Sequence, residues 1–403
     1  MLKKNETLYN MHAGIFTLPE AFARAPAVLA MGAELKSSFC LLETGQAQLF
    51  ESNDDLEQPN VFRAYNDALQ SACSTYAFSP NQIALDMHPD YLSTQIGIGL
   101  AERYESNTIS VQHHHAHIAA CLAEYAHPMH ADPVLGIALD GLGFGADGTI
   151  WGGEFLLANY TGFTRLACFQ PVAMPGGAQA IREPWRNTLA HLHACGWKSI
   201  TNQFPNIDIM TFLHNKPLAV LETMLNKGLN SPTASSAGRL FDAVAACLDI
   251  HREMVNQEGQ AAIALERIAS QVIDKTTEAY PFNITACPDG LIQLQWQAMW
   301  QAILTDIDQG MDQSVIAARF HQTLITAVSE LAMNLCQQHQ IKRVVLSGGV
   351  FQNHLLRSGV ERVLQRHGFK MMIAQQTPIN DGGLPLGQAA IAAATCLSGA
   401  GHV

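Results

Sequence analysis

The sequence predicts a mixed α/β protein made of two similar lobes with a cleft between them. Apolar strands alternate with helical stretches, a pattern typical of strand–helix–strand crossovers and of sheets that are parallel in part. Each half also opens in the same way, with a strand, a polar or glycine-containing turn and two further strands, which indicates a weak internal repeat. With 403 residues, 48% of them hydrophobic and 14% charged, the chain is long enough for more than one buried core.

In the first half, apolar runs and turn signals predict a regular order of elements. Strands are expected at 27–31, 38–42, 46–50, 82–85 and 108–111. A helical period covers 61–76, a second helix follows residue 85, and a third runs from His113 to about Ala126. We expect residues 1–25 to form an N-terminal arm, and residues 26–131 to form lobe I.

The second half predicts lobe II over residues 132–385, with a helical insertion at about 176–230. A strand at 134–139 ends at Asp140 and leads into a glycine-rich loop at 141–148, followed by strands at 149–157 and 163–169. Apolar residues spaced by 3.6 mark a long helix through 316–335, before a strand at 343–346 and a helix from about Asn353. A strand at 370–374 and a last helix at 386–397 close the chain, and we expect residues 386–403 to join lobe I.

Charge and cysteine content exclude several classes of protein. The net charge of −12, without a dense Lys/Arg run, argues against bulk binding of nucleic acid. No run of about 18 apolar residues and no signal peptide are present, so we expect no membrane segment. Nine scattered cysteines without a CxxC pair fit reduced thiols in a cytoplasmic protein and exclude a cysteine-based zinc ribbon.

The densest chemical signal is the histidine cluster of residues 113–117, at a strand-to-helix junction. Histidines four apart lie on one helix face, so His113 and His117 could chelate one divalent ion. His114 and His117, three apart, are a competing pair, and a plain surface cluster is the alternative to a metal site. Two histidines do not complete a ligand shell, so a carboxylate must come from elsewhere.

Two aspartates could complete that shell. Asp140 ends a strand at the start of the glycine loop, and Asp381 lies in an Asn-Asp-Gly-Gly turn before the last helix. Acids beside glycine at strand ends collect ions in α/β folds, although each alone is more simply a turn or capping residue. Together with the histidines, Asp381 is the favoured ligand.

Glycine loops and isolated charged residues give weaker signals of an anion or nucleotide site. The loop at 141–148 and the Ser-Gly-Gly at 347–349 follow apolar strands, although neither matches a P-loop or a dinucleotide fingerprint. Asp242 could accept a ribose hydroxyl or be an exposed helix acid, and Lys36 could meet an anionic ligand or be a solvated turn lysine. Cys40 lies within a strand and is expected to pack there, and no serine-nucleophile elbow or HExxH motif is present.

Nine separated blocks of the sequence resemble the HypF family of hydrogenase maturation carbamoyltransferases. They follow one another in the family's order from about residue 26 to the end of the chain, and they lie at residues 32–36, 88–94, 111–120, 147–154, 182–186, 238–244, 258–262, 346–353 and 380–388. The resemblance covers the family's C-terminal carbamoyl-transfer module, which is related to the threonylcarbamoyl-transferases of tRNA modification. It implies the actin/sugar-kinase/Hsp70 fold, with a nucleotide in the cleft between the lobes.

The resemblance also implies roles for individual residues. His113, His117 and Asp381 would hold one divalent metal, iron or zinc, with Asp140 in or next to its shell. Lys36 would meet the phosphate or carbonyl of carbamoyl-adenylate, and we expect Lys36 and Asp140 to be catalytic. The residues expected around carbamoyl-adenylate, AMP or ATP are Gly141, Gly238, Asp242, Gly348, Gly349 and Asn353.

By the same resemblance, the module would move a carbamoyl group from carbamoyl-adenylate to the C-terminal cysteine of the partner HypE, for the cyanide ligands of [NiFe]-hydrogenase. HypF proteins carry an acylphosphatase domain, zinc fingers and a YrdC-like adenylating domain ahead of this module. None of them is expected in these 403 residues, whether the chain is a fragment or a stand-alone relative. The donor would therefore come from an external or separate YrdC-like domain.

Three alternatives remain open. One is O-carbamoylation of a small-molecule hydroxyl, which relatives of the module perform, and another is a non-catalytic scaffold that binds nucleotide and metal. A tRNA modification role is less favoured, because that branch usually has His-Met-Glu-Gly-His where this chain has His-His-His-Ala-His, and because the chain is acidic.

Overall fold

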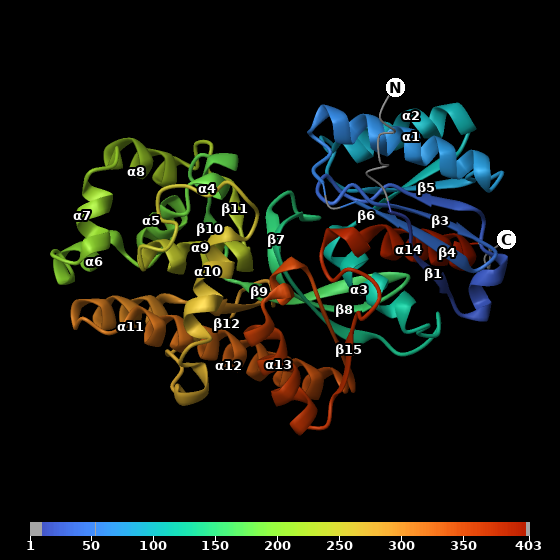
Figure 1. Ribbon diagram of the computed structural model, residues 1–403. Helices are drawn as coiled ribbons and strands as arrows, with labels where there is room; N and C mark the ends of the chain where they lie inside the picture. The colour runs from blue at the N-terminus through green and yellow to red at the C-terminus, as the bar shows by residue number, and fades with distance from the viewer. Residues whose placement is uncertain (1–9, 53, 400–403) are drawn as a thin grey trace.

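Two mixed β-sheets flanked by helices make up the computed structural model, which describes residues 10–52 and 54–399 (Figure 1). The first sheet has six strands. Strand β5 pairs in parallel with both β2 and β6, and the other neighbouring strands are antiparallel. Its order across the sheet is β1 (Asn10–Thr17), β4 (Gln46–Glu51), β3 (Phe39–Glu43), β2 (Val28–Ala30), β5 (Gln82–Asp86) and β6 (Asn107–Val111).

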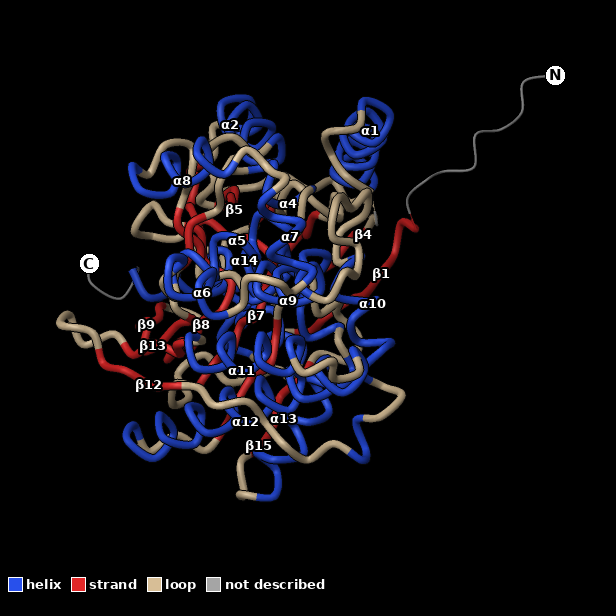
Figure 2. The backbone as a smooth tube through the Cα atoms, turned by 90° about the vertical axis from the view of Figure 1, so that its left-hand side faces the viewer, coloured by secondary structure: helices blue, strands red, loops and turns tan. Residues whose placement is uncertain are grey.

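The second sheet has nine strands, seven of them on one path. These seven are β12 (Asn283–Ala286), β13 (Ile292–Gln295), β9 (Gly162–Phe169), β8 (Ile150–Asn159), β7 (Val134–Phe144), β14 (Arg343–Ser347) and β15 (Lys370–Ile373). Two short strands complete it: β11 (Thr233–Ala234) pairs with β8, and β10 (Val172–Ala173) pairs with β11. The hairpin of β12 and β13 projects from the edge of this sheet (Figure 2).

The two sheets share a common plan. The order β4-β3-β2-β5-β6 in the first matches β9-β8-β7-β14-β15 in the second, with three antiparallel strands followed by two parallel ones in both. The internal repeat and the two-lobed α/β class predicted from the sequence are therefore confirmed.

Helices cover both sheets and fill the space between them. The first lobe carries the 3₁₀ helix η1 (Glu20–Arg24), α1 (Pro59–Thr75) and α2 (Leu92–Tyr104), and α3 (His113–Glu124) leads into β7. The insertion after β10 holds α4 (Ala178–Arg182), α5 (Trp185–Ala194), α6 (Trp197–Gln203), α7 (Asp208–His214) and α8 (Leu218–Lys227). The remaining helices are α9 (Ala237–Cys247), α10 (Gln260–Ala269), η2 (Ile273–Lys275), α11 (Gln297–Asp308), α12 (Gln313–His339), η3 (Gly349–Gln352), α13 (His354–Arg366), η4 (Asp381–Gly383) and α14 (Leu384–Gly399).

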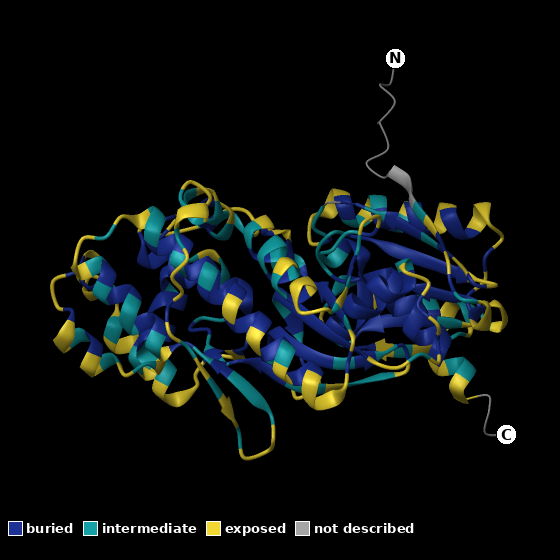
Figure 3. Cartoon of the chain, turned by 90° about the horizontal axis from the view of Figure 1, so that it is seen from below, coloured by how far each residue is buried: buried dark blue, intermediate teal, exposed yellow. Residues whose placement is uncertain are grey.

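Helices α3 and α14 are the buried centre of the molecule. Both pack with strands of the first sheet in one apolar core that also includes Val134, Leu156 and Val345 of the second sheet. Figure 3 shows the buried residues concentrated in the middle of the protein and the exposed ones on the outer helices. At Gly387 the two helices come so close that an added Cβ would lie 1.9 Å from the carbonyl oxygen of Ala116. The last helix thus belongs to the core that supports the first sheet.

The structure differs from the sequence pattern in two places. The predicted loop at 141–148 is wrong in its first half, because β7 continues to Phe144 and only the segment after it turns back into β8. The pairing of β7 with β8 shifts register between Leu139 and Gly143, so the glycines lie at an irregularity within the strand. Because Gly143 has no side chain, the rings of His113 and His114 can lie against it. The structure also adds β1 and η1 within residues 10–24, while the first nine residues lie outside the described part of the chain.

Within the described residues, no helix is both long enough and apolar enough to span a bilayer.

Candidate functional site

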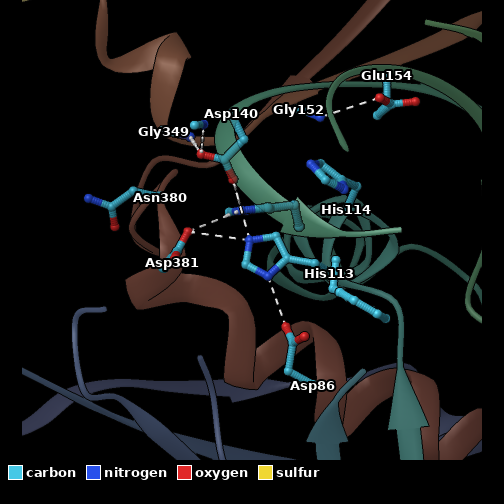
Figure 4. Close-up of polar contacts among 12 residues, drawn as sticks. Asp86, His113, His114, Asp140, Gly152, Glu154, Gly349, Asn380 and Asp381 are labelled. Atoms are coloured by element: carbon cyan, nitrogen blue, oxygen red, sulfur yellow. Dashed lines mark hydrogen bonds and ion pairs between the residues drawn. The ribbon is translucent and has the colours of Figure 1, made fainter. Parts of the chain in front are cut away.

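Helix α3 begins with the histidine cluster and holds it in a fixed position. The side chain of Gln112 caps the helix by accepting a hydrogen bond from the His115 amide at 2.9 Å. His113 and His117 lie one turn apart on the same face, with ring centroids 5.1 Å from each other. Both rings are buried and lie beside Asp140, which is within β7, and Figure 4 shows the ring of His113 turned towards this carboxylate.

Four ligand atoms from three distant segments converge at this point. His117 Nε2 lies 2.8 Å from Asp140 Oδ2 and 3.5 Å from Asp381 Oδ1. His113 Nε2 lies 3.4 Å from the same oxygen of Asp140 and 3.6 Å from that of Asp381. The candidate metal centre is therefore made of His113, His117, Asp140 and Asp381, whose ligand atoms all lie within 4.8 Å of one another.

These separations suit a transition metal. Ligands at about 2.0–2.1 Å from zinc are about 3.4 Å apart at a tetrahedral angle and about 2.9 Å apart at a right angle. His113 Nε2 is buried and has no hydrogen-bond partner among the described residues, which is costly for a ring nitrogen unless a ligand takes its lone pair. The donor set of two imidazoles and two carboxylates fits iron or zinc.

A second layer of contacts orients the ligands. Asp86, at the end of β5, lies with its Oδ2 2.8 Å from His113 Nδ1. When that nitrogen carries the proton and donates to Asp86, Nε2 is left as the acceptor that faces the other ligands. The other oxygen of Asp140 accepts hydrogen bonds from the amides of Gly141 and Gly349, at 2.8 and 3.2 Å. Both contacts fix ring and carboxylate directions before any ion binds.

The electrostatics of the cluster favour charge pairing in the absence of a metal. Burial alone would lower the pKa of His113, but the charge of Asp381, the nearby carboxylate of Asp140 and the hydrogen bond to Asp86 hold it well above its usual range. The pKa of His117 is raised as well, against burial, mainly by its hydrogen bond to Asp140. Burial would raise the pKa of the Asp140 carboxyl, but the nearby His113 ring and the hydrogen bond to His117 hold it well below its ordinary value. A cation at this position would replace the proton charge that the histidines otherwise supply.

The other two histidines of the cluster face elsewhere. His114 Nδ1 lies 3.1 Å from the Gln112 side chain, and the ring is near Trp151. His115 Nε2 lies 2.6 Å from the backbone oxygen of Asn159, and burial lowers the pKa of His115 to about 4. The pair His113 and His117, not His114 and His117, therefore faces the two aspartates.

A cavity of about 850 Å³ opens beside the candidate metal centre, and Asp140 and Gly141 belong to its wall. Lys36 lines it from the first lobe and lies 3.3 Å from Glu258 of the second lobe. Both side chains of this ion pair are partly exposed, so the pair is a weak link across the cleft. Five of the six residues predicted to surround a nucleotide also line the cavity, namely Gly141, Gly238, Asp242, Gly349 and Asn353.

The predicted nucleotide residues have different surroundings. Gly238 comes so close to β7 that an added Cβ would lie 3.0 Å from the Gly141 Cα. Gly348 has φ +100°, and a Cβ there would meet the Leu139 carbonyl oxygen at 2.3 Å, so this glycine serves close packing beneath the cavity. The Asn353 side chain accepts from the Leu356 amide at 2.9 Å and lies 3.0 Å from His321 Nε2. Its amide is therefore already used to cap α13.

Asp242 is not the exposed helix acid of the simpler alternative. It is buried, and burial raises the pKa of its carboxyl against the nearby charge of Arg239, which forms an ion pair with it at 2.7 Å. Arg239 itself has two buried nitrogens, Nε and Nη1, without partners among the described residues. The charged pair lies in the cavity wall, where a polar ligand can reach it.

Sequence reasoning missed Asp86, Arg239 and Glu258 as site residues. Asp86 directly follows the predicted strand 82–85. Like Asp140, it is an acid at the end of a predicted strand, the position where ions collect in α/β folds. Arg239 and Glu258 lie within blocks noted for their resemblance, but neither has a local pattern that predicts a contact.

Comparison with known proteins shows a consistent set of relatives. Residues 23–124 match the family profile described as the HypF Kae1-like domain, and residues 136–388 match that of the carbamoyltransferase Kae1-like domain, second subdomain. The chain is 37% identical to carbamoyltransferase HypF of Rhodobacter capsulatus over 382 residues, which cover 94% of the chain and 48% of that protein. It is 36% identical to a carbamoyltransferase HypF homolog of Cupriavidus necator, with 94% of both chains covered.

Solved structures agree with these relatives. Full-length HypF in its phosphate- and nucleotide-bound form has a TM-score of 0.83 at 32% identity, over 94% of this chain and 47% of the other. HypF of T. kodakarensis has a TM-score of 0.81 at 28% identity, over 96% of this chain and 49% of the other. The chain thus spans about half the length of most of the curated relatives that it matches, and the predicted two-lobed fold is the fold of the matching half.

Proposed function

The chain belongs to the carbamoyltransferase HypF family, and we propose that it moves a carbamoyl group from carbamoyl-adenylate to the C-terminal cysteine of HypE, a step towards the cyanide ligands of [NiFe]-hydrogenase. One observation carries the proposal. Asp140 belongs both to the cluster of metal-type ligands and to the wall of the large cavity, so a bound nucleotide ester would have its reactive end beside the cluster.

The cavity supplies groups of the right kind for the donor. Gly238 and Gly349 contribute backbone to the cavity wall, and a Cβ at either would face the β7 side, 3.0 Å from the Gly141 Cα and 3.1 Å from Asp140 Oδ1, so these glycines let the wall pack closely behind a ligand. The Asp242 carboxylate can accept hydrogen bonds from ribose hydroxyls. Lys36 can pair with the phosphate or the carbonyl oxygen of the donor when its ion pair with Glu258 is broken. Carbamoyl-adenylate, AMP and ATP share the groups that these residues recognise.

His113, His117, Asp381 and Asp140 would hold a divalent ion, iron or zinc, between the lobes. Such an ion supplies Lewis-acid stabilisation of negative charge on phosphate and carbonyl oxygens. Asp86 keeps the proton of His113 on Nδ1, and Gly349 keeps one oxygen of Asp140 away from the cluster. Lys36, in the cavity wall, would add a second positive charge for the same oxygens.

The transfer needs no covalent intermediate on this chain. No cysteine or serine is among the described residues that line the cavity, and burial raises the pKa of most of the cysteines, including Cys40, Cys121 and Cys247. The HypE thiolate would attack the carbamoyl carbon directly. A sulfur–carbon bond forms, the bond from that carbon to the phosphate oxygen breaks, and AMP leaves with the electron pair. Holding both partners in one cleft removes much of the cost of their encounter.

The donor would be made by a YrdC-like adenylating domain on another chain or segment. We place the reaction in the cytoplasm, where thiols stay reduced, and all nine cysteines of this chain are unpaired.

The test is to mix the metal-loaded chain with synthetic carbamoyl-adenylate and HypE, and to follow the HypE mass and AMP release. We expect one carbamoyl group on wild-type HypE and none on HypE without its terminal cysteine. The variants His117→Ala and Lys36→Met should slow the transfer at least 100-fold. Carbamoylation of an added sugar or other small alcohol, with HypE unchanged, would favour the O-carbamoyltransferase, and binding of HypE without transfer would favour the scaffold.

A further inference from the structure

The candidate metal centre brings together parts of the chain that are far apart in sequence. His113 and His117 are at the start of α3, whereas Asp381 begins the short helix η4 near the C-terminal end. Asp381 follows an irregular segment, residues 374–380, that has no strand or helix of its own. A ligand on such a segment needs a contact that sets its position relative to the histidines, because loops adopt many conformations when nothing holds them.

Glu124, the last residue of α3, makes that contact. Its carboxylate accepts hydrogen bonds from three successive backbone amides, those of Gln375 at 2.6 Å, Gln376 at 3.1 Å and Thr377 at 2.7 Å. Three N–H groups on one carboxylate make a charge-assisted set of hydrogen bonds that is stronger than neutral ones. We call this arrangement, Glu124 with the amides of 375–377, the Glu124 clasp.

The same rigid element thus carries both the histidine ligands and the clasp. Residues 113–123 of α3 are all buried, so the helix has little freedom to bend. Helical rise places Glu124 about 10 Å from His117 along the axis. On the far side of Asp381, the close contact between Gly387 and the Ala116 backbone ties α14 to the middle of α3. Asp381 therefore lies between two attachments to one helix.

The position of Glu124 would be unfavourable without this role. An acid at the C-terminal end of a helix is repelled by the negative end of the helix dipole. Residue Tyr125, which follows, binds the neighbouring strand instead, with its hydroxyl 3.2 Å from the Ile373 carbonyl oxygen and 3.4 Å from the Ile373 amide. It anchors β15, whereas Glu124 holds the amides of 375–377 and the Gly348 amide donates to the Ile379 carbonyl oxygen at 2.9 Å, closer to Asp381.

We infer that Glu124 is a positioning residue for the metal centre, which sets the distance of Asp381 from the α3 histidines through the segment 375–380. This role rests on the proposed metal site. It makes a specific prediction, that loss of the clasp weakens metal binding although Glu124 touches no ligand.

The experiment titrates the metal-free full chain with Co²⁺ alone and records the affinity and the visible d–d absorption. Glu124→Gln replaces one acceptor oxygen by a donor that faces an N–H group, and we expect its Co²⁺ dissociation constant to rise about 10-fold with an altered absorption band. Tyr125→Phe is the matched control and should bind Co²⁺ as the wild type does. Hydrogen exchange should become faster at the amides of 375–377 in Glu124→Gln, with circular dichroism unchanged.

Each outcome discriminates. Equal Co²⁺ affinity and an equal spectrum for wild type and Glu124→Gln would overturn the clasp while leaving the metal site standing. An equal loss in Tyr125→Phe would also overturn it, because general loosening of this region would then explain the effect. Failure of the wild type to bind Co²⁺ would overturn the metal site itself, and the role of Glu124 with it.

Discussion

Replacing Gly387 by alanine should test how tightly α3 and α14 are packed. The added Cβ would lie 1.9 Å from the Ala116 oxygen and 2.8 Å from the Ala120 nitrogen, both backbone atoms that no rotamer change can move. Restoring normal contact requires a separation of roughly 1 Å, enough to lose a quarter to a half of each dispersion contact nearby. Overpacking costs about 1–3 kcal/mol, and the upper value applies here because the clash is with backbone.

A glycine-to-alanine change also gains helix propensity, about 1 kcal/mol, so we expect Gly387→Ala to lower the free energy of unfolding by about 2 kcal/mol. The control is Gly99→Ala in α2, where a Cβ meets nothing within 4 Å and the propensity gain should appear alone. Urea unfolding followed by circular dichroism measures both. If Gly387→Ala is as stable as Gly99→Ala, the close approach of the two helices is refuted.

Three further predictions concern the site and its surroundings. Asp86→Asn, which no longer fixes the proton of His113 on Nδ1, should weaken Zn²⁺ binding by about 10–100-fold in a competition titration. Lys36→Met should weaken AMP binding about 10-fold by calorimetry, whereas Glu258→Gln should tighten it a few-fold, since the lysine then has no competing carboxylate. Burial lowers the pKa of His191 to about 3, so at mildly acidic pH the unfolded chain binds a proton that the folded chain does not. The free energy of unfolding therefore decreases as the pH falls below about 6.5. Between pH 6.5 and 5, this decrease should be about 2 kcal/mol smaller in His191→Leu than in the wild type.

These predictions have clear contrary results. Unchanged Zn²⁺ affinity in Asp86→Asn would mean that this hydrogen bond does not orient the ring. Equal AMP affinity in Lys36→Met would remove Lys36 from the anion site, and weaker binding in Glu258→Gln would show that the glutamate contacts ligand directly. Parallel pH profiles for wild type and His191→Leu would show that His191 does not stay neutral in the folded chain.

Apolar patterning was sufficient to predict most of the fold. Central strands such as β5, β7 and β14 are continuous apolar runs, and α12 keeps a 3.6-residue period along its length, because these elements bury most of their surface. The hairpin of β12 and β13 was not predicted, since it lies at a sheet edge, each of its strands has only four residues, and most of β12 is exposed. Glycines 141 and 143 pointed to a loop although they belong to a strand that passes close to the histidine rings.

The candidate metal centre could be predicted only in part. Helical spacing alone pairs His113 with His117, but it also permits His114 with His117, and only the structure shows which pair faces the aspartates. No periodicity relates α3 to Asp381, which was favoured because it is an acid beside glycines before a helix, and the family resemblance agreed with that choice. Asp86 had the same strand-end signal as Asp140 but no local pattern that links it to His113, and the role of Glu124 depends on which backbone amides tertiary packing brings beside it.

The dependence of the first sheet on α14 has a consequence for synthesis on the ribosome. The Gln388 side chain binds both the amide and the carbonyl of Gly32, at 2.8 and 3.1 Å, and α14 covers the apolar face formed by β2 and β3. The early strands therefore leave the exit tunnel long before the helix that shields them has been translated. The apolar face of these strands therefore stays exposed in the nascent chain through most of elongation. Chaperones should bind this face until α14 has left the ribosome and packs on it.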